Sequence, residues 1–167
     1  MLVDHELTGV LVGMTLATRP HEVYRALVEA TAFGTRTIID AFDGAGLAVG
    51  EFIAAGGLLR NELLMQCYAD VLGRTISVID SDQGPALGSA MHAAVAAGAH
   101  PDIFAAAAAM GRNRPGVYRP DPARGRAYDE LYDVYVSLHD HFGRDRRDLM
   151  RALQSMRERV AAAERAR

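Results

Sequence analysis

The sequence predicts an α/β domain, in which short apolar strands alternate with longer helices along the chain. Three short stretches carry the apolar and β-branched residues typical of buried strands. They are residues 9–16 (GVLVGMTL), 51–55 (EFIAA) and 75–79 (TISVI). Each is followed by a helical pattern, and these patterns cover about residues 18–42, 61–72 and 85–97. This alternation favours parallel pairing with right-handed crossovers, and so a mainly parallel sheet flanked by helices.

Capping residues support the boundaries of these helices. Thr18 is a candidate N-cap with Pro20 in the first turn, and apolar residues then recur at helical spacing to about residue 42. The second helix starts near Asn61 and ends at Gly73, a residue that suits the left-handed position after a helix. The third is a run of small residues closed by Gly98. We therefore expect three strand-to-helix units before residue 100.

The chain changes character after about residue 100, and we predict a boundary at residue 110. Residues 1–110 are expected to form the α/β core, and residues 111–167 a turn-rich excursion followed by C-terminal helices. Three prolines within residues 112–126 favour a surface excursion. Residues 128–138 and 145–164 show arginine-laced amphipathic patterns, which predict a helical tail. Its charged face is typical of simple solvation, and pairing with another chain is the alternative.

Composition excludes several classes of site and partner. All 18 basic residues are arginines, so no P-loop lysine or Schiff-base lysine is available. A net charge of -3 gives no reason to expect nucleic acid as a partner. Cys67 is the single cysteine, which excludes an internal disulfide and favours a reducing compartment. No apolar run reaches the roughly 20 residues that span a bilayer. We expect a cytoplasmic protein without a membrane segment, and attribute the alanine run 105–109 to compositional bias.

The carboxyl ends of two predicted strands are the candidate binding sites, because ligands of open parallel sheets bind there. The first end carries Gly56 and Gly57, which allow a ligand to approach the backbone without a Cβ in the way. The following helix directs free N–H groups to the same place. Asn61 offers both a donor and an acceptor, which suit a purine edge or a ribose hydroxyl. A plain turn capped by Asn61 is an equal alternative, because a glycine pair is a weak signal.

The second strand end carries the turn-forming residues 80–84. Asp80 and Asp82 are open to two interpretations, a carboxylate pair for a metal or residues that cap and shape a turn, and the second is favoured. Cys67 lies on the apolar side of its helix, which is typical of a packed thiol rather than a nucleophile. The residues by themselves thus indicate an α/β domain with a candidate nucleotide-binding edge and no visible catalyst, and no metal ligand is assigned.

Residues 9–29 (GVLVGMTLATRPHEVYRALVE) resemble a signature of the FGGY family of carbohydrate kinases. The positions that match at the family's spacing are Gly9, Leu11, Gly13, Met14, Glu22, Val23, Ala26 and Glu29. The stretches EATAFGTRTIIDAF, GGLLRN, YADVLGR and PALGSAM continue the match in order, so the resemblance covers nearly the whole chain. Residues 135–149 (YVSLHDHFGRDRRDL) are more similar to the ribulokinase branch of this family than to glycerol or xylulose kinases.

This resemblance implies an actin-like ATPase fold of two ribonuclease-H-like domains, of which these residues supply the C-terminal one. In the family the GG-x-x-x-N turn holds the adenosine part of ATP, which assigns Gly56, Gly57 and Asn61 as nucleotide contacts. The resemblance also places the first phosphate loop, most sugar contacts and the catalytic aspartate in an N-terminal domain outside these residues. No catalytic residue is therefore assigned, and the 167 residues alone are expected to be inactive. The expected reaction transfers the γ-phosphate of ATP, with Mg²⁺, to a ketopentose such as L-ribulose.

Two further functions stay open beside the kinase. The first is a non-catalytic assembly module, in which the α/β layer and the arginine-rich tail serve subunit contacts, for example in a homodimer. The second is a dinucleotide-binding oxidoreductase domain, which is disfavoured because no G-x-G-x-x-G follows the first predicted strand.

Overall fold

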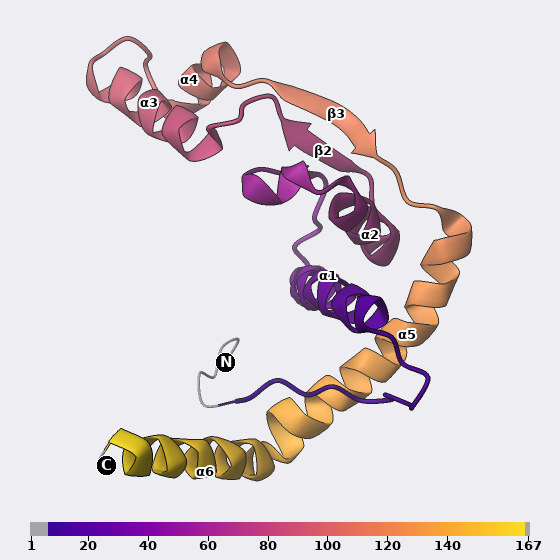
Figure 1. The fold of residues 1–167 in the computed structure, drawn as a ribbon. Helices are drawn as coiled ribbons and strands as arrows, with labels where there is room; N and C mark the ends of the chain where they lie inside the picture. Colours follow the sequence, from indigo (N-terminus) through magenta and orange to yellow (C-terminus); the bar gives the residue numbers. More distant parts are fainter. Residues whose placement is uncertain (1–6, 166–167) are drawn as a thin grey trace. The chain divides into compact units, whose positions relative to one another are not determined.

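The computed structural model describes residues 7–165, which fall into two compact units. The central unit is Arg25–Asp129, and the terminal unit combines the residues up to Tyr24 with those from Glu130 onward. The helices, shown in Figure 1, are α1 (Pro20–Gly44), α2 (Glu62–Leu72), α3 (Gly84–Ala96), α4 (Ile103–Met110), α5 (Pro122–Asp140) and α6 (Arg147–Arg165). The predicted division of the chain after residue 110 stays a prediction.

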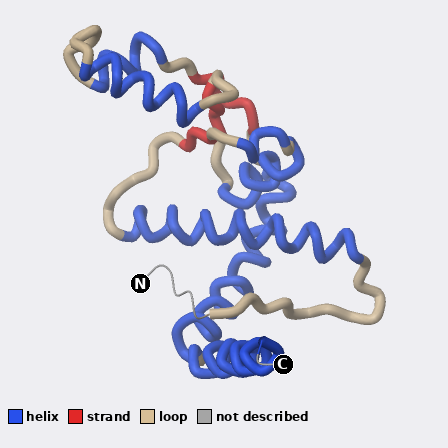
Figure 2. Tube along the Cα trace, turned by 60° about the vertical axis from the view of Figure 1, so that its left-hand side comes forward, coloured by secondary structure: helices blue, strands red, loops and turns tan. Residues whose placement is uncertain are grey.

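The sheet belongs to the central unit and has three strands, drawn in red in Figure 2. They are β1 (Phe52–Ala54), β2 (Ile76–Ile79) and β3 (Asn113–Tyr118), in the order β1-β2-β3. β1 and β2 pair in parallel, with Phe52 opposite Ile76, whereas β3 runs antiparallel to β2. The predicted α/β class is confirmed, but the sheet of the described residues is small and mixed rather than mainly parallel.

Both ends of helix α2 are set by residues next to them in the sequence. The Asn61 side chain accepts a hydrogen bond from the backbone N–H of Leu64 at 3.0 Å, which satisfies one free donor of the first turn. At the other end Gly73 adopts the left-handed conformation, with φ 60° and ψ 23°. Both ends lie where the sequence predicts them. The helices predicted over about residues 18–42 and 85–97 are likewise present as α1 and α3.

The strand predicted at residues 9–16 is wrong. The backbone there forms no strand, and most of the large apolar side chains of the segment, among them Leu11, Val12 and Met14, are more than half exposed. β-branched and apolar residues favour a strand only where a neighbour satisfies the backbone N–H and C=O groups. Among residues 7–165 no strand pairs with this segment, since the sheet contains only β1, β2 and β3.

Two elements of the structure are absent from the sequence-based expectations. β3 lies within the segment predicted as a turn-rich excursion, because Pro115 and Gly116 resemble a turn in the sequence. Proline is tolerated in β3 because this is an edge strand. Helix α4 coincides with the alanine run attributed to compositional bias. The N-cap residue Asp102 is a sequence feature that indicates the start of this helix. Its carboxylate accepts from the N–H of Ala105 at 2.8 Å.

The core of the central unit lies between α2 and the sheet. Ile76 of β2 is fully buried and clusters with Met65 and Ala69 of α2. Cys67 is 3% exposed, and its Sγ lies 3.8 Å from the hydroxyl of Tyr128. Burial raises the pKa of the Cys67 thiol, so the neutral form is favoured. The prediction of a packed, unreactive thiol agrees with this environment.

A partly buried hydrogen-bond network joins α1 to the first turns of α5 within the central unit. The Tyr128 hydroxyl donates to Glu29 Oε1 at 2.8 Å and accepts from Arg25 Nη2 at 2.7 Å. Arg25 Nε also donates to Glu29 Oε1 at 2.8 Å. Burial raises the pKa of Tyr128, which keeps its hydroxyl protonated and able to donate to Glu29. Tyr128 therefore links α5 to α1, two helices that are distant in the sequence.

A second network is centred on the carboxylate of Asp70, which is 3% exposed. Its Oδ1 accepts from Gln66 Nε2 at 2.9 Å and from the backbone N–H of Asp121 at 2.8 Å. Its Oδ2 accepts from Arg124 Nε at 2.6 Å. These bonds fix the start of α5 against α2. A buried carboxylate is stable here because each oxygen has a partner.

The terminal unit contains the end of α5, a π-helical turn (His141–Asp145) and α6. Met150 of α6 is 4% exposed, and its sulfur accepts a hydrogen bond from the Thr8 hydroxyl at 3.7 Å. This contact joins the N-terminal segment to α6. None of the helices within residues 7–165 combines the length and apolar character needed to cross a membrane.

Candidate functional site

A cavity of about 510 Å³ lies beyond the carboxyl ends of β1 and β2. Because these strands are parallel, the turns that follow them meet at the same edge of the sheet. Gly56, Gly57 and Arg60 line one side, from the turn after β1. Residues 80–83 line the other side, from the turn after β2. The two strand ends singled out by the sequence thus form one cavity.

The glycine turn has a backbone that only glycine adopts readily. Gly56 has φ 94° and ψ -167°, and it is followed by a 3-10 turn, Gly57–Arg60. An added Cβ would meet no heavy atom within 4 Å at Gly56 or at Gly57. Space is therefore open above both residues, and the backbone conformation rather than crowding requires glycine at position 56. A flat ligand can approach the peptide groups of this turn directly.

Asn61 follows this turn but is not among the residues that line the cavity. Its Oδ1 caps α2, so the alternative of a capped turn is present in the structure. The side-chain nitrogen has no hydrogen-bond partner within residues 7–165 and keeps two donors. The capping role and a ligand-binding role are therefore compatible, since they use different atoms of the same amide.

The turn after β2 is shaped by Ser81, whose hydroxyl accepts from the N–H of Gln83 at 3.2 Å. Gln83 is the N-cap residue of α3, and its side chain makes no capping bond. The Asp80 carboxylate lies 3.5 Å from Arg114 Nε, across the β2–β3 pair. Within residues 7–165 no group of three or more His, Cys, Asp or Glu side chains could hold a metal ion. Asp80 forms an ion pair with Arg114 beside the cavity.

The charges around the cavity are balanced. Asp80 and Asp82 supply two negative charges, and Arg60 and Arg114 supply two positive ones. A triphosphate needs a clear excess of positive charge or a set of converging backbone donors. A nucleoside is neutral and polar, and it suits a cavity of this size with open glycine backbone on one wall. The residues present thus fit the adenosine part of ATP better than its phosphates.

Arg114 is a lining residue that sequence reasoning missed, because it belongs to the unrecognised strand β3. No local pattern could have identified it, because Arg112, Asn113 and Arg114 are consecutive polar residues and Pro115 and Gly116 then favour a turn.

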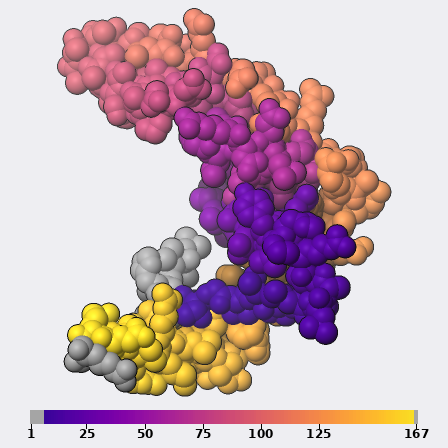
Figure 3. All heavy atoms as spheres, in the orientation of Figure 1, coloured from indigo at the N-terminus to yellow at the C-terminus, as the bar shows by residue number. Residues whose placement is uncertain are grey.

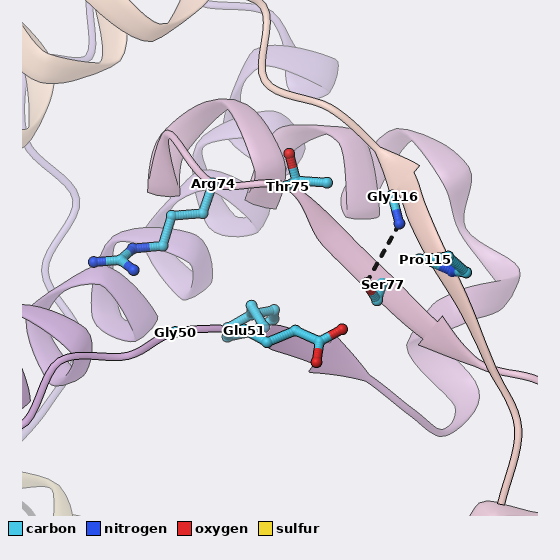
Figure 4. Close-up of a pocket in the computed structure, with 8 residues that line it drawn as sticks. Gly50, Glu51, Arg74, Thr75, Ser77, Pro115 and Gly116 are labelled. Carbon is cyan, nitrogen blue, oxygen red and sulfur yellow. Dashed lines mark hydrogen bonds between the residues drawn. The ribbon is translucent and has the colours of Figure 1, made fainter.

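A second cavity, of about 390 Å³, lies at the amino ends of the same strands (Figure 4). The backbone N–H of Gly116 donates to the Ser77 hydroxyl at 3.3 Å across this cavity. Arg74 points away from these two residues in the figure. Its guanidinium is bound to Asp43 Oδ2 at 2.8 Å and to the carbonyl of Val49. Ser77 and Arg74 are thus engaged in hydrogen bonds, and we assign no ligand to this cavity.

Comparison with known proteins identifies the family. The model of the FGGY family of carbohydrate kinases, C-terminal domain, matches residues 1–97. This chain belongs to that family. A ribulokinase from Halalkalibacterium halodurans is 51% identical over 162 residues, which cover 94% of this chain and 29% of the relative. A ribulokinase from Mycolicibacterium smegmatis is 49% identical over 164 residues, 98% of this chain and 29% of that protein. The chain thus spans under a third of these FGGY kinases.

Solved structures of FGGY kinases show the same fold. The xylulose kinase from Rhodospirillum rubrum aligns with a TM-score of 0.65 and 31% identity, over 79% of this chain and 27% of that one. The gluconate kinase from Lactobacillus acidophilus aligns with a TM-score of 0.70 and 21% identity, over 86% of this chain and 29% of that one. The predicted class, the C-terminal α/β domain of an actin-like ATPase fold, is confirmed by these neighbours.

Proposed function

We propose that this FGGY domain supplies the adenosine side of the active site of an ATP-dependent sugar kinase. The substrate that we propose is a ketopentose, and L-ribulose is preferred because relatives near 50% identity are ribulokinases. The observation that carries the proposal is the cavity at the carboxyl ends of β1 and β2, which contains Gly56 and Gly57. These two residues, with Asn61, are the proposed nucleotide contacts.

In this proposal the chain binds and orients the nucleoside, and other residues carry out the chemistry. Peptide groups at Gly56 and Gly57 face the open cavity, and the free amide nitrogen of Asn61 donates to a ribose or purine acceptor. Phosphoryl transfer depends on positioning, on stabilising the γ-phosphate charge and on a base for the sugar hydroxyl. Mg²⁺ would neutralise the phosphate oxygens when bound. No described residue is assigned as its ligand or as the base.

Mg-ATP is expected to shift the backbone amide resonances of Gly56, Gly57 and Asn61 in a saturable titration of the labelled chain. Binding should be weak, with a dissociation constant on the order of 1 mM, because a single wall buries little of the nucleotide. Adenosine should shift the same amides as ATP, since the cavity suits the nucleoside. Unchanged resonances of Gly56 and Gly57 up to about 10 mM, well past this range, would contradict the assignment.

Two substitutions at Asn61 separate binding from capping. Asn61→Asp keeps the capping oxygen and removes the N–H donors, so it should weaken binding with little loss of stability. Asn61→Ala removes both functions. Asp102→Ala is the matched control, because Asp102 caps α4 through the N–H of Ala105 in the same way but does not follow the glycine turn that lines the cavity. Equal affinity of the Asn61→Asp variant and the wild type would remove Asn61 from the proposed site.

The chain by itself is expected not to phosphorylate L-ribulose, because no described residue is proposed as the base. A coupled assay for ADP release, run with Mg-ATP and L-ribulose at millimolar concentrations, tests this. Turnover that depends on the sugar and disappears in a Gly56→Val variant would show that these residues contain a complete catalytic site.

A further inference from the structure

The side chain of Gln83 lines the cavity beyond β1 and β2 and makes no hydrogen bond to any residue between 7 and 165. Only its backbone is engaged. The N–H donates to the Ser81 hydroxyl at 3.2 Å, and the carbonyl accepts from the N–H of Leu87 at 2.9 Å. The residue is exposed, so its carboxamide keeps both a donor and an acceptor for a ligand.

The start of α3 holds Gln83 beside the glycine turn. The next residue is Gly84, where an added Cβ would lie 3.7 Å from Ala55 Cβ and 3.7 Å from Ile79 Cδ1. Ala55 immediately precedes the glycine pair in the sequence. The 3-10 turn Gly57–Arg60 and helix α3 accordingly adjoin on the face drawn in Figure 3. Gln83 and the glycine turn are therefore neighbouring parts of the cavity wall.

Apolar side chains complete a surface for a flat aromatic ring. Leu59, Ile79 and Pro85 line the same cavity. Leu59 packs against the core cluster of α2 and β2, and both Leu59 and Ile79 are partly buried, so the core sets their positions. A purine has two apolar faces and a polar edge. The cavity offers the same division, with apolar groups for the faces and a carboxamide for the edge.

Given the proposed nucleotide site, on which this step rests, we infer that Gln83 selects the base. Its Oε1 accepts from the 6-amino group of adenine, and its Nε2 donates to the ring nitrogen beside that group. A carboxamide presents these two atoms side by side, which is how glutamine pairs with adenine in protein–DNA complexes. The ligand class is therefore a 6-aminopurine nucleoside or nucleotide.

The other polar groups near the cavity do not offer this pair of atoms. The carboxylates of Asp80 and Asp82 only accept, so the ring nitrogen of adenine would face a second acceptor. The two arginines that line the cavity only donate. Asn61 uses its Oδ1 to cap α2, which leaves its nitrogen as a donor. Among the described residues that line the cavity, Gln83 is the one carboxamide.

Titration of the labelled 167-residue chain with adenosine and with purine riboside tests this role. Purine riboside lacks only the 6-amino group and keeps the ring nitrogens and the ribose. The backbone amides of Gly56 and Gly57 report binding of both nucleosides. The wild type should bind adenosine about fivefold more tightly, because the hydrogen bond from the amino group to Gln83 Oε1 is missing in the other complex.

Gln83→Met should abolish this preference, so that both nucleosides bind with equal affinity. Methionine has a similar length and removes both the donor and the acceptor. The substitution should leave stability unchanged, because the Gln83 side chain makes no capping bond. Gln154→Met is the matched control and should keep the preference. Gln154 lies on α6, donates to Glu158 Oε1 at 3.3 Å and does not line the cavity.

The possible outcomes separate this role from the nucleotide site itself. Equal binding of both nucleosides by the wild type, or a preference that survives Gln83→Met, overturns the role of Gln83 and leaves the adenosine site in place. Loss of the preference in Gln154→Met as well also overturns it, because the effect is then not local to the cavity. If neither nucleoside shifts the amides of Gly56 and Gly57, the proposed function fails, and selection of the base by Gln83 fails with it.

Discussion

Asp70→Ala is expected to lower the free energy of unfolding by about 3 kcal/mol, the size typical of breaking a buried, hydrogen-bonded charge pair. The substitution removes the acceptor for Gln66 Nε2, for the N–H of Asp121 and for Arg124 Nε together. Alanine also leaves unfilled volume at a position that is 3% exposed. Urea unfolding followed by far-UV circular dichroism measures the loss.

Asp129→Ala is the control for this prediction. Asp129 also accepts from an arginine at 2.8 Å, but its side chain is 62% exposed. An exposed pair of this kind contributes about 0 to 1 kcal/mol, because water competes for both groups. A similar loss of unfolding free energy in the two variants would mean that burial does not strengthen the contribution of the Asp70 ion pair to stability.

Ile76→Ala should cost about 2 to 5 kcal/mol, the range for large-to-small changes in well-packed cores. Ile76 is fully buried on the central strand and packs against Met65 and Ala69 of α2. Neither Met65 nor Ala69 can fill the cavity left by the substitution without losing its present contacts. The value follows from the same urea unfolding measurement.

Ile53→Ala removes the same atoms from the neighbouring strand, where the side chain is 44% exposed. The cost there should be well below that of Ile76→Ala, since much of the side chain is already in water. Equal costs would place the core of the central unit somewhere other than between β2 and α2.

The parts of the fold that sequence predicted are those set by local chemistry. Asn61 and Gly73 bound α2 because a cap and a left-handed glycine act on their own helix ends. Strands depend on partners, and this is where prediction failed. Residues 9–16 have strand composition without a partner in the sheet, while β3 has turn composition and is held by β2. The local composition of a segment does not reveal which strand it pairs with.

The candidate site divides in the same way. Gly56 and Gly57 were identifiable because they follow a predicted strand, where a glycine pair lets a ligand approach the backbone, although the pair by itself equally fits a plain turn. That the turn after β2 joins them followed from predicting a parallel pair. Arg114 could not be predicted, because it reaches the cavity only through the antiparallel strand β3. Asn61 was predicted beside the glycines, but it does not line the cavity with them.

The irregular strand β3 decides on which side the sheet can grow. Pro115 has no N–H, and the N–H of Gly116 is directed at the Ser77 side chain rather than outward. Neither residue therefore offers a donor to a strand on the outer side, and the positive φ of Gly116 turns the backbone there. A further strand can form a continuous ladder only with β1, so extension of this sheet by another polypeptide segment would proceed from Phe52–Ala54 and not from β3.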